Sequence, residues 1–454
     1  CIQFLWNYGA HLVSYKTIVG DKHNGGLMLN DIYLKMLSFR LKFLAKYFCT
    51  SKDFLWKHIL KYHLSKICSL GANSEIFLLR LFSQDLPTLP QFYKEMFSAW
   101  YAIEDYVIFN QKESDVYNFC LFCNPKVTNK GKMLKWNVFI KAGVTHVKHI
   151  AYEVIPGFLP SSYIVDIIQE YDPDVNVLAM KENYRTLLES IPREWTEYVK
   201  EKEFHNMAFL ADFCVKYENQ SIVFSTCTVK IFYKLLIHKL FQHPVSNSFW
   251  KEKFNIDDSD VFFKRWGTLL ESYKPPEIIE LDFKMYHNAI FTYEKLFIIG
   301  KTESNCCPIC SLQNEDIIHL FIGCNELHEF INKFVVYHLE TLFKDVDVNI
   351  FNTLRFDEMF FSSLSTGIKN VNTFFVNFFL SICRLSIYKR RQLFIKSQQK
   401  MDVTKFCKYM LRQFISYNHY QLCIKENRRN IFSKLFLNRN PLVKETEGVL
   451  IFIF

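Results

Sequence analysis

The run CPICSLQNEDIIHLFIGC, residues 307–324, carries the most specific pattern in this 454-residue chain. Cys307 and Cys310 are separated by two residues, a spacing that brings two thiolates to one metal ion. His319 follows after eight intervening residues, and Cys324 after four more. These side chains form the ligand set of a closed tetrahedral zinc site, which is structural because no position is left open for a reactive water. The sequence therefore predicts a small CCHC zinc knuckle holding a structural Zn²⁺.

The surroundings of the four residues support this interpretation. Cys306 adjoins Cys307 and is an alternative ligand, but the Cys-Pro-Ile-Cys turn favours Cys307. Cys324 lies five residues after His319, slightly more than one helical turn, so both side chains can face one ion. The competing interpretation is four unconnected core residues. Residue type, spacing and the apolar neighbours together favour zinc.

A second pair with the same spacing, Cys120 and Cys123, is followed by His146 and His149. These four residues are also of the types that bind zinc. The gap between Cys123 and His146 is long, however, and a chain with 14 cysteines produces such pairs by chance. The residues alone leave open whether this pair binds a second metal.

Length and composition predict a mainly α, multi-helical fold with a few short strands. The chain is too long for one hydrophobic core, which indicates two to four domains. It has only 13 Gly and 12 Pro, which favours long helices over tight turns. Apolar periodicity predicts a helix capped by Asp31, one started by Pro192, and others over 54–66, 91–106, 161–171, 177–190, 228–242, 325–343 and much of 370–427. The expected regions are 1–106 (helical connector), 107–160 (irregular or hairpin insert), 161–273 (helical), 274–345 (zinc knuckle) and 346–454 (basic helices).

The sequence contains no pattern typical of secretion or of a membrane span. The sequence shows no signal-peptide pattern, and its most apolar stretch, residues 374–383, is shorter than the roughly 20 residues that span a bilayer. The cysteines are not spaced as in a disulfide framework, so we expect them to be free thiols or metal ligands. We therefore expect an intracellular protein with no membrane partner. The chain begins with Cys1 rather than Met, and we expect it to be part of a longer protein.

Charge is distributed unevenly along the chain. Residues 371–454 contain 15 Lys/Arg and 4 Asp/Glu, residues 1–150 contain 19 and 10, and the middle contains 21 and 32. A strongly basic C-terminal block favours contact with the phosphates of a nucleic acid, although solvated helix faces are the alternative. Aromatic residues interleave with these cations, and for each ring a place in the helix core is the favoured interpretation. The candidate nucleic-acid-binding residues are Arg384, Lys389, Arg390, Arg391, Lys396, Lys405, Lys408 and Arg412.

Several blocks, taken in order, resemble the C-terminal third of the reverse transcriptase of non-LTR (LINE-type) retrotransposons. The zinc run is similar to the family's zinc-binding signature, in which Glu315 and Phe321 accompany the four ligands. Each further block is weak alone, but their shared order covers most of the chain. These blocks are Phe4-Leu5-Trp6, GGLMLNDI (25–32), LPQFY (89–93) with Ala99-Trp100, NPKV (124–127), IPREW (191–195), KIFYKLL (230–236), His287 and LSIYK (385–389).

The resemblance implies a role in target-primed reverse transcription. This region would hold the RNA template, the target DNA or both, and its partners would be the polymerase and endonuclease portions of the same polyprotein. Residues 1–106 would be the connector after the polymerase thumb. Cys120 and Cys123 fall where the family has large apolar residues, which implies packing positions. The implied location is the nucleus, with a cytoplasmic ribonucleoprotein stage.

Catalytic residues are not expected in this chain. Polymerase chemistry needs paired aspartates that hold two Mg²⁺ ions. Asp257-Asp258 lacks the aromatic residue that precedes the family's pair, and we interpret it as a helix cap or loop. Pro173-Asp174 has no partners for a nuclease site. We therefore expect no enzyme activity and no small-molecule substrate. The alternative function is a degenerate or repurposed transposon remnant that acts as a zinc-stabilised protein-interaction module.

Overall fold

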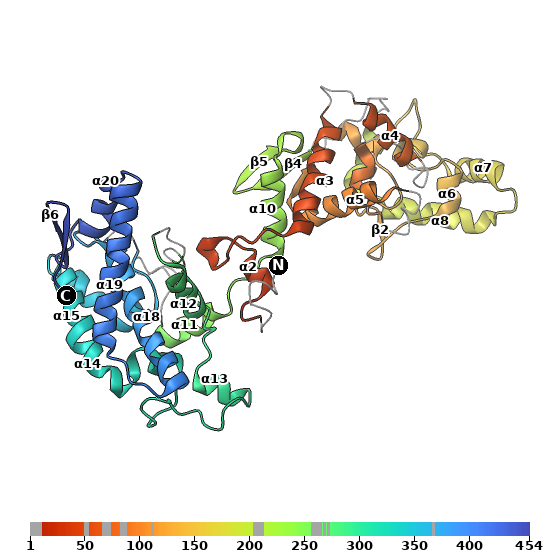
Figure 1. Ribbon diagram of the computed structural model, residues 1–454. Helices are drawn as coiled ribbons and strands as arrows, with labels where there is room; N and C mark the ends of the chain where they lie inside the picture. Colours follow the sequence, from red (N-terminus) through yellow and green to blue (C-terminus); the bar gives the residue numbers. More distant parts are fainter. Residues whose placement is uncertain are drawn as a thin grey trace. The chain divides into compact units, whose positions relative to one another are not determined.

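The computed structural model describes residues 11–49, 54–65, 74–81, 89–109, 113–202, 213–255, 266, 269, 273–365 and 368–454. The chain divides into two compact units. Unit 1 comprises Cys1–Leu29 and Phe241–Phe454, and unit 2 comprises Asn30–Leu240. The described residues are mainly helical with a few short strands, which confirms the predicted fold class (Figure 1).

These units differ from the five regions expected from sequence. Residues 1–29 belong with the C-terminal half rather than with the connector, and the segments 274–345 and 346–454 share one hydrophobic core. The reason is that a single buried helix, described below, packs against elements from both sides of the expected boundary at 345. Residues 107–160 are irregular with one small hairpin, and they contribute Leu121, Phe122 and Phe139 to the core of unit 2.

Unit 2 is built around three helices. Helix α3 packs against α10 and α5 and buries Leu37, Leu41 and Leu44 at helical spacing. Asp31 caps α3 as predicted, since its side chain accepts a hydrogen bond from the Leu34 amide at 2.8 Å. The α-helices of unit 2 are α3 (Ile32–Phe48), α4 (Leu55–Ser65), α5 (Gln91–Ala102), α6 (Asn137–Lys141), α7 (Ser161–Tyr171), α8 (Val177–Ser190), α9 (Arg193–Glu201) and α10 (Val229–Leu240).

Short strands and turns fill the rest of unit 2. One antiparallel sheet has the order β1-β4-β5, and β2 and β3 form a separate hairpin with Gly131 in the left-handed region at its turn. The strands are β1 (Val107–Phe109), β2 (Thr128–Asn129), β3 (Lys132–Met133), β4 (Phe213–Tyr217) and β5 (Gln220–Val223). The short helical turns are η2 (Ser74–Leu78), η4 (Glu104–Tyr106), η5 (Glu113–Asn118), η6 (Val147–His149) and η7 (Phe224–Thr226).

Unit 1 packs around α18 (Thr373–Ser397). Every residue from Phe375 to Ile387 is buried, so this helix is enclosed on all sides rather than amphipathic. The other α-helices of unit 1 are α2 (Tyr15–Ile18), α11 (Ser246–Phe254), α12 (Pro276–Tyr286), α13 (Tyr293–Ile298), α14 (His328–Phe330), α15 (Tyr337–Leu342), α16 (Val348–Thr353), α17 (Phe356–Phe361), α19 (Val403–His419) and α20 (Arg429–Phe432). Its other elements are η1 (Lys22–Asn24), η8 (His319–Gly323), η9 (Asn325–Leu327), η10 (Ile331–Val336), η11 (Tyr420–Lys425), η12 (Ser433–Leu437), β6 (Val443–Thr446) and β7 (Val449–Phe452).

The Gly25-Gly26 pair forms a turn in unit 1 for two different reasons. Gly25 has φ 89°, a conformation that side-chain-bearing residues rarely adopt. Gly26 lies so close to the backbone of Gly20 that a Cβ atom would collide with it. The Gly25 carbonyl lies 2.9 Å from the Nε2 atom of His287, which ties this turn to the end of α12.

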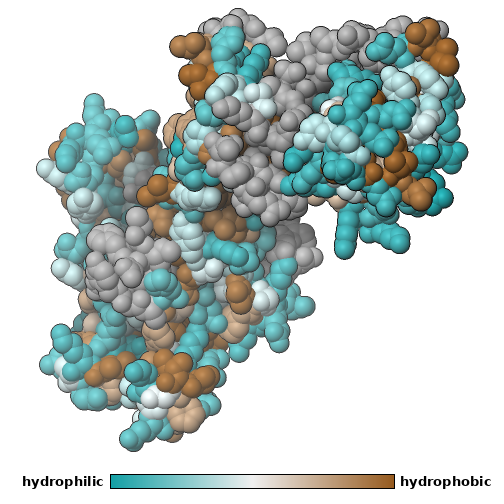
Figure 2. Space-filling view, turned by 90° about the vertical axis from the view of Figure 1, so that its right-hand side faces the viewer, coloured by the Kyte–Doolittle hydropathy of each residue, from teal (hydrophilic) through white to brown (hydrophobic). Residues whose placement is uncertain are grey.

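Most of the predicted helices are confirmed. Helices α7 and α8 have the expected bounds, and α9 begins directly after Pro192. The predicted helix over 325–343 is an unbroken helical stretch from η9 to α15, in which 3-10, α-helical and π-helical turns follow one another. No helix among the described residues combines the length and the hydropathy needed to cross a membrane. Hydrophilic residues cover much of the surface seen in Figure 2, with separate hydrophobic patches between them.

Candidate metal centre

The four residues predicted as zinc ligands lie together in unit 1. The ligand atoms of Cys307, Cys310, His319 and Cys324 are all within 4.8 Å of one another, and all but Cys310 are buried. The Cys310 Sγ atom is 3.4 Å from the His319 Nε2 atom. In a tetrahedral site with ordinary Zn–S and Zn–N bonds, a sulfur and a nitrogen ligand are about 3.5 Å apart. The cluster is therefore compatible with a zinc site.

Local backbone bonds shape the knuckle. The Cys307 N–H donates to the Gln313 carbonyl, and the Cys307 carbonyl accepts from the Ser311 N–H, both at 2.8 Å. Ser311 adopts φ 57°, which turns the chain back after Cys310. The neighbouring Cys306 is not part of the cluster, and its sulfur lies 3.9 Å from the Asn305 side-chain oxygen. Cys307 rather than Cys306 therefore belongs to the cluster, as the predicted ligand set requires.

The backbone after the knuckle explains how His319 and Cys324 reach the same point. Residues His319–Gly323 form a π-helical turn, which is wider than an α-helical turn and suits an i, i+5 pair. The Asp316 carboxylate accepts from the His319 amide at 2.7 Å and so fixes the start of this turn.

A side-chain contact orients the imidazole of His319. Its Nδ1 atom lies 3.1 Å from the Gln313 Oε1 atom, so the protonated Nδ1 donates outward while Nε2 faces the sulfurs. Metal-binding histidines are usually held in this way by a partner on the other ring nitrogen. The Cys307 and Cys324 sulfurs share a hydrogen bond, which lowers the pKa of Cys307 to about 4 and raises the pKa of Cys324.

Glu315 and Arg391 form a buried ion pair beside the cluster. Arg391 donates from Nε and Nη2 to the two carboxylate oxygens of Glu315 at 2.8 and 2.6 Å. The Tyr293 amide donates to the same carboxylate at 2.8 Å. This bidentate pair connects the knuckle to α18, and residues from both line one small void between them.

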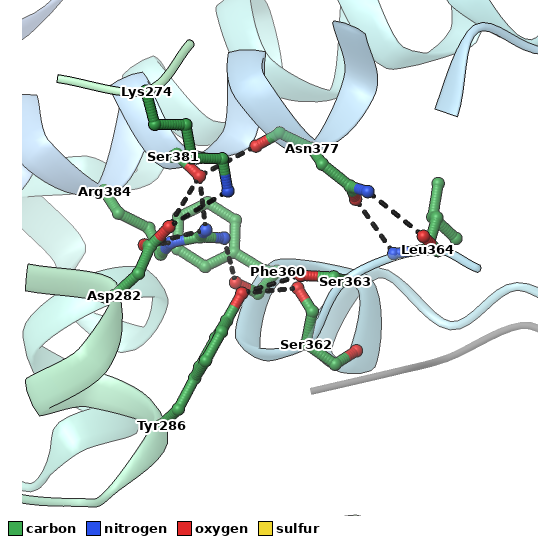
Figure 3. A network of polar contacts seen from close by, with 10 residues as sticks. All are labelled: Lys274, Asp282, Tyr286, Phe360, Ser362, Ser363, Leu364, Asn377, Ser381 and Arg384. Atoms are coloured by element: carbon green, nitrogen blue, oxygen red, sulfur yellow. Dashed lines mark hydrogen bonds and ion pairs between the residues drawn. The ribbon is translucent and has the colours of Figure 1, made fainter. Parts of the chain in front are cut away.

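Arg384 was predicted to contact nucleic acid, and its placement contradicts that role. Its side chain is 1% exposed and donates to Asp282 of α12 at 2.9 Å, to the Phe360 carbonyl and to Ser381 (Figure 3). The buried Lys274 ammonium lies 3.6 Å from the same Asp282 carboxylate. The physical reason is that Arg384 sits within the fully enclosed part of α18, where a charge must be paired.

Arg390 and Arg391 are corrected for the same reason. Both are buried, Arg391 on Glu315 and Arg390 on the backbone and carboxylate of Glu326 at 3.0 and 3.4 Å. Lys389 is less enclosed and pairs with Glu277 at 2.9 Å. The arginines of α18 therefore join acidic side chains of the middle segment and are not available to phosphates in this conformation.

The remaining candidates lie at or near the surface. Lys396 and Arg412 are exposed and form no ion pair within the described part of the chain. Lys405 is exposed beside Asp402, and Lys408 is partly buried with its ammonium 5.7 Å from the Phe334 ring centre. The structure thus leaves Lys396, Lys405 and Arg412 as the accessible members of the predicted set.

Three exposed tyrosines were not predicted as surface features. Tyr409, Tyr417 and Tyr420 are more than half exposed on α19 and η11, near the accessible cations. The aromatics interleaved with the cations are Phe394, Phe406, Tyr409 and Phe414. The three phenylalanines are partly buried, in line with the favoured core interpretation, whereas Tyr409 is exposed and contradicts it. The helical spacing of exposed polar positions along 402–420 was the signal that could have found the tyrosines.

The second Cys-x-x-Cys pair does not assemble a comparable cluster. Cys120 Sγ lies 3.2 Å from His146 Nε2, but within the described residues Cys123 belongs to no group of three potential ligands. Asp257-Asp258 and Phe4-Leu5-Trp6 lie outside the described residues.

Comparison with known proteins adds no further assignment. No protein-family model matches the chain, and no curated protein matches it.

Proposed function

We propose that unit 1 binds one structural Zn²⁺ through Cys307, Cys310, His319 and Cys324. The observation that carries this proposal is the convergence of four ligand atoms within 4.8 Å, three of them buried. Three thiolates and an imidazole are soft to borderline donors that zinc prefers over magnesium or calcium. Bound zinc would lock the π-helical turn to the knuckle and leave no open coordination position.

Metal content of the purified full-length chain tests this assignment. We expect about one zinc per chain by elemental analysis, and its loss in Cys307→Ser and His319→Ala. Cys306→Ser is a matched control, because that residue is adjacent but outside the cluster, and it should retain the metal. Replacement of zinc by Co²⁺ should give a spectrum typical of three thiolates and one nitrogen. Full zinc content in both ligand variants would contradict the proposal.

We further propose that the chain is a non-catalytic part of a LINE-type reverse transcriptase that binds template RNA, target DNA or both. The ordered blocks listed above and the zinc signature support this. Accessible cations on α18 and α19 support it too: residues 392–454 carry far more Lys/Arg than Asp/Glu, and the exposed Lys396 and Arg412 form no ion pair with another described residue. Exposed tyrosines beside them offer surfaces on which unpaired bases stack.

A charge-reversal experiment separates this surface from general electrostatic attraction. Lys396→Glu, Lys405→Glu and Arg412→Glu together should weaken binding to single-stranded RNA at least about tenfold and reduce the salt slope by about two. The control is the reversal of three exposed lysines elsewhere in unit 1, Lys301, Lys344 and Lys369. It changes net charge equally and should have a much smaller effect. Equal affinities in the two triple variants would count against this surface.

The alternative is a transposon remnant that serves as a zinc-stabilised protein-interaction module. This function predicts full zinc content together with salt-insensitive or undetectable nucleic-acid binding. The two experiments are independent, so the zinc site can hold while the nucleic-acid role fails.

A further inference from the structure

The C-terminal hairpin is a two-stranded sheet, so within the described residues the outer edge of β7 pairs with no further strand. β6 and β7 pair antiparallel from Thr446–Val449 at the turn to Val443–Phe452. Glu447 and Gly448 between them have φ 51° and 81°, the conformation of a type I′ turn. In the described part of the chain this sheet has two strands.

The phase of the ladder decides which backbone groups point outward. A two-residue turn makes Thr446 and Val449 a hydrogen-bonded pair, and such pairs recur at every second residue. The Ile453 amide donates to the Leu442 carbonyl at 2.9 Å, in agreement with this phase. The N–H and C=O groups of Leu450 and Phe452 therefore point away from β6, along the outer edge of β7.

The two faces of β7 are both apolar. Leu450 and Phe452 pack against the core of unit 1. Val449, Ile451 and Ile453 point to the opposite face and are 65%, 46% and 47% exposed. The run from Val449 to Phe454 contains no charge, proline or glycine. Natural edge strands usually carry one of these to prevent pairing with another chain.

We propose that β7 pairs antiparallel with β7 of a second copy of this chain, about a twofold axis at Ile451. Leu450 of each copy would then lie opposite Phe452 of the other, and the outward backbone groups would form four hydrogen bonds. Two hairpins become one four-stranded sheet, which is more stable than a two-stranded ribbon alone.

Several features select a second copy over a charged peptide. The exposed face of β7 presents no charge that would recognise one. The sequence is compatible with its own reversal, because every position from Val449 to Phe454 is an aliphatic or aromatic residue. On the exposed face, Val449 of one copy meets Ile453 of the other, and the two Ile451 side chains meet directly at the axis.

The axis position provides a sharp test by analytical ultracentrifugation of the full-length chain. Ile451→Lys places two ammonium groups directly opposite each other and should raise the dimer dissociation constant at least about tenfold. Ile451→Glu should do the same, and an equimolar mixture of the two variants should restore dimers through an opposite-charge pair. Ile424→Lys is the control, since Ile424 is an exposed isoleucine on η11 that is not part of the strand.

The outcomes separate cleanly. A concentration-dependent dimer that is lost in each single variant and regained in the mixture is the expected result. A chain that stays monomeric at all concentrations overturns the proposal, as does a dimer that Ile451→Lys leaves unchanged. Loss of the dimer in Ile424→Lys would place the interface elsewhere.

Discussion

Unit 1 and unit 2 each contain a Cys-x-x-Cys pair followed by histidine, and only the pair in unit 1 builds a four-ligand cluster. In unit 1, Cys307, Cys310, His319 and Cys324 converge within 4.8 Å. In unit 2, Cys120 meets His146 at 3.2 Å, but no third potential ligand joins them within the described residues. The same residue types at the same local spacing therefore lead to different local environments.

The cysteines, rather than the histidines, account for the difference. His319 uses Nδ1 on the Gln313 side chain and leaves Nε2 facing the sulfurs. His149 likewise uses Nδ1, to accept the amide hydrogens of Thr145 and His146 at 3.1 and 3.3 Å, so its Nε2 is the nitrogen left for a metal. Three cysteines converge on His319 in unit 1, whereas Cys123 joins no group of three potential ligands within the described residues. The lesson is that a ligand set must be judged by whether the sulfurs of the pair face the same point.

Removal of the metal should give the largest contrast between the two regions. Zinc sites of this type contribute on the order of 10 kcal/mol to folding, so a strong chelator should destabilise the knuckle by several kcal/mol at least. Hydrogen exchange followed by mass spectrometry would report this directly. Amides of residues 305–327 should lose protection, while amides of residues 119–150 should keep theirs. Equal loss in both regions would contradict the comparison.

A smaller effect is expected from breaking the buried ion pair beside the cluster of unit 1. Glu315→Gln leaves Arg391 buried without its carboxylate and should cost about 3–5 kcal/mol of unfolding free energy. Chemical denaturation measures this difference. The double variant Glu315→Leu with Arg391→Met removes both charges and should recover most of the loss. A double variant as unstable as the single one would show that the pair itself, rather than the orphaned charge, sets the cost.

The ion pairs mark the limit of prediction from sequence. The zinc ligands, the helix caps and the bounds of several helices followed from local spacing, because the residues concerned lie close together in the chain. Arg384 is paired with Asp282, which lies 102 residues away in the chain. Arg391 is paired with Glu315, which lies 76 residues away. No local pattern reveals such partners, so a count of basic residues overestimated the accessible charge.

One signal for burial was nevertheless present. Arg384 stands within an almost continuous apolar run, residues 374–387, and a helix that is apolar all round is enclosed. A charge there must find an opposite charge inside the protein. By contrast, the spacing within the pair does not distinguish Cys120 and Cys123 from Cys307 and Cys310, since two residues lie between the cysteines of each pair.

The second region should show its own pH dependence, smaller than the previous effects. Burial lowers the pKa of His146 to about 3, with the neighbouring His149 and Lys148 acting in the same direction. The unfolded chain binds this proton near pH 6.5, so His146 lowers stability progressively as pH falls from 6.5 towards 3 and has no effect above 6.5. The slope from one such group is about 1.4 kcal/mol per pH unit.

His146→Gln tests this by urea unfolding at several pH values between 4 and 7. The variant should lose less stability on acidification than the parent chain, and the two curves should run parallel above pH 7. The experiment should follow a signal from unit 2, since unit 1 contains other titrating groups. Identical slopes below pH 6.5 would mean that His146 is not buried as a neutral imidazole.

The smallest change in the free energy of unfolding should come from Cys120→Ser in unit 2. Exchange of this buried thiol for a hydroxyl in contact with His146 should cost about 1–2 kcal/mol, since the more polar group loses hydration but keeps a hydrogen-bond partner. Zinc content should stay equal to that of the parent chain, in contrast to Cys307→Ser, which makes the same chemical change at a ligand position. A loss of zinc in Cys120→Ser would show that the second pair also binds metal.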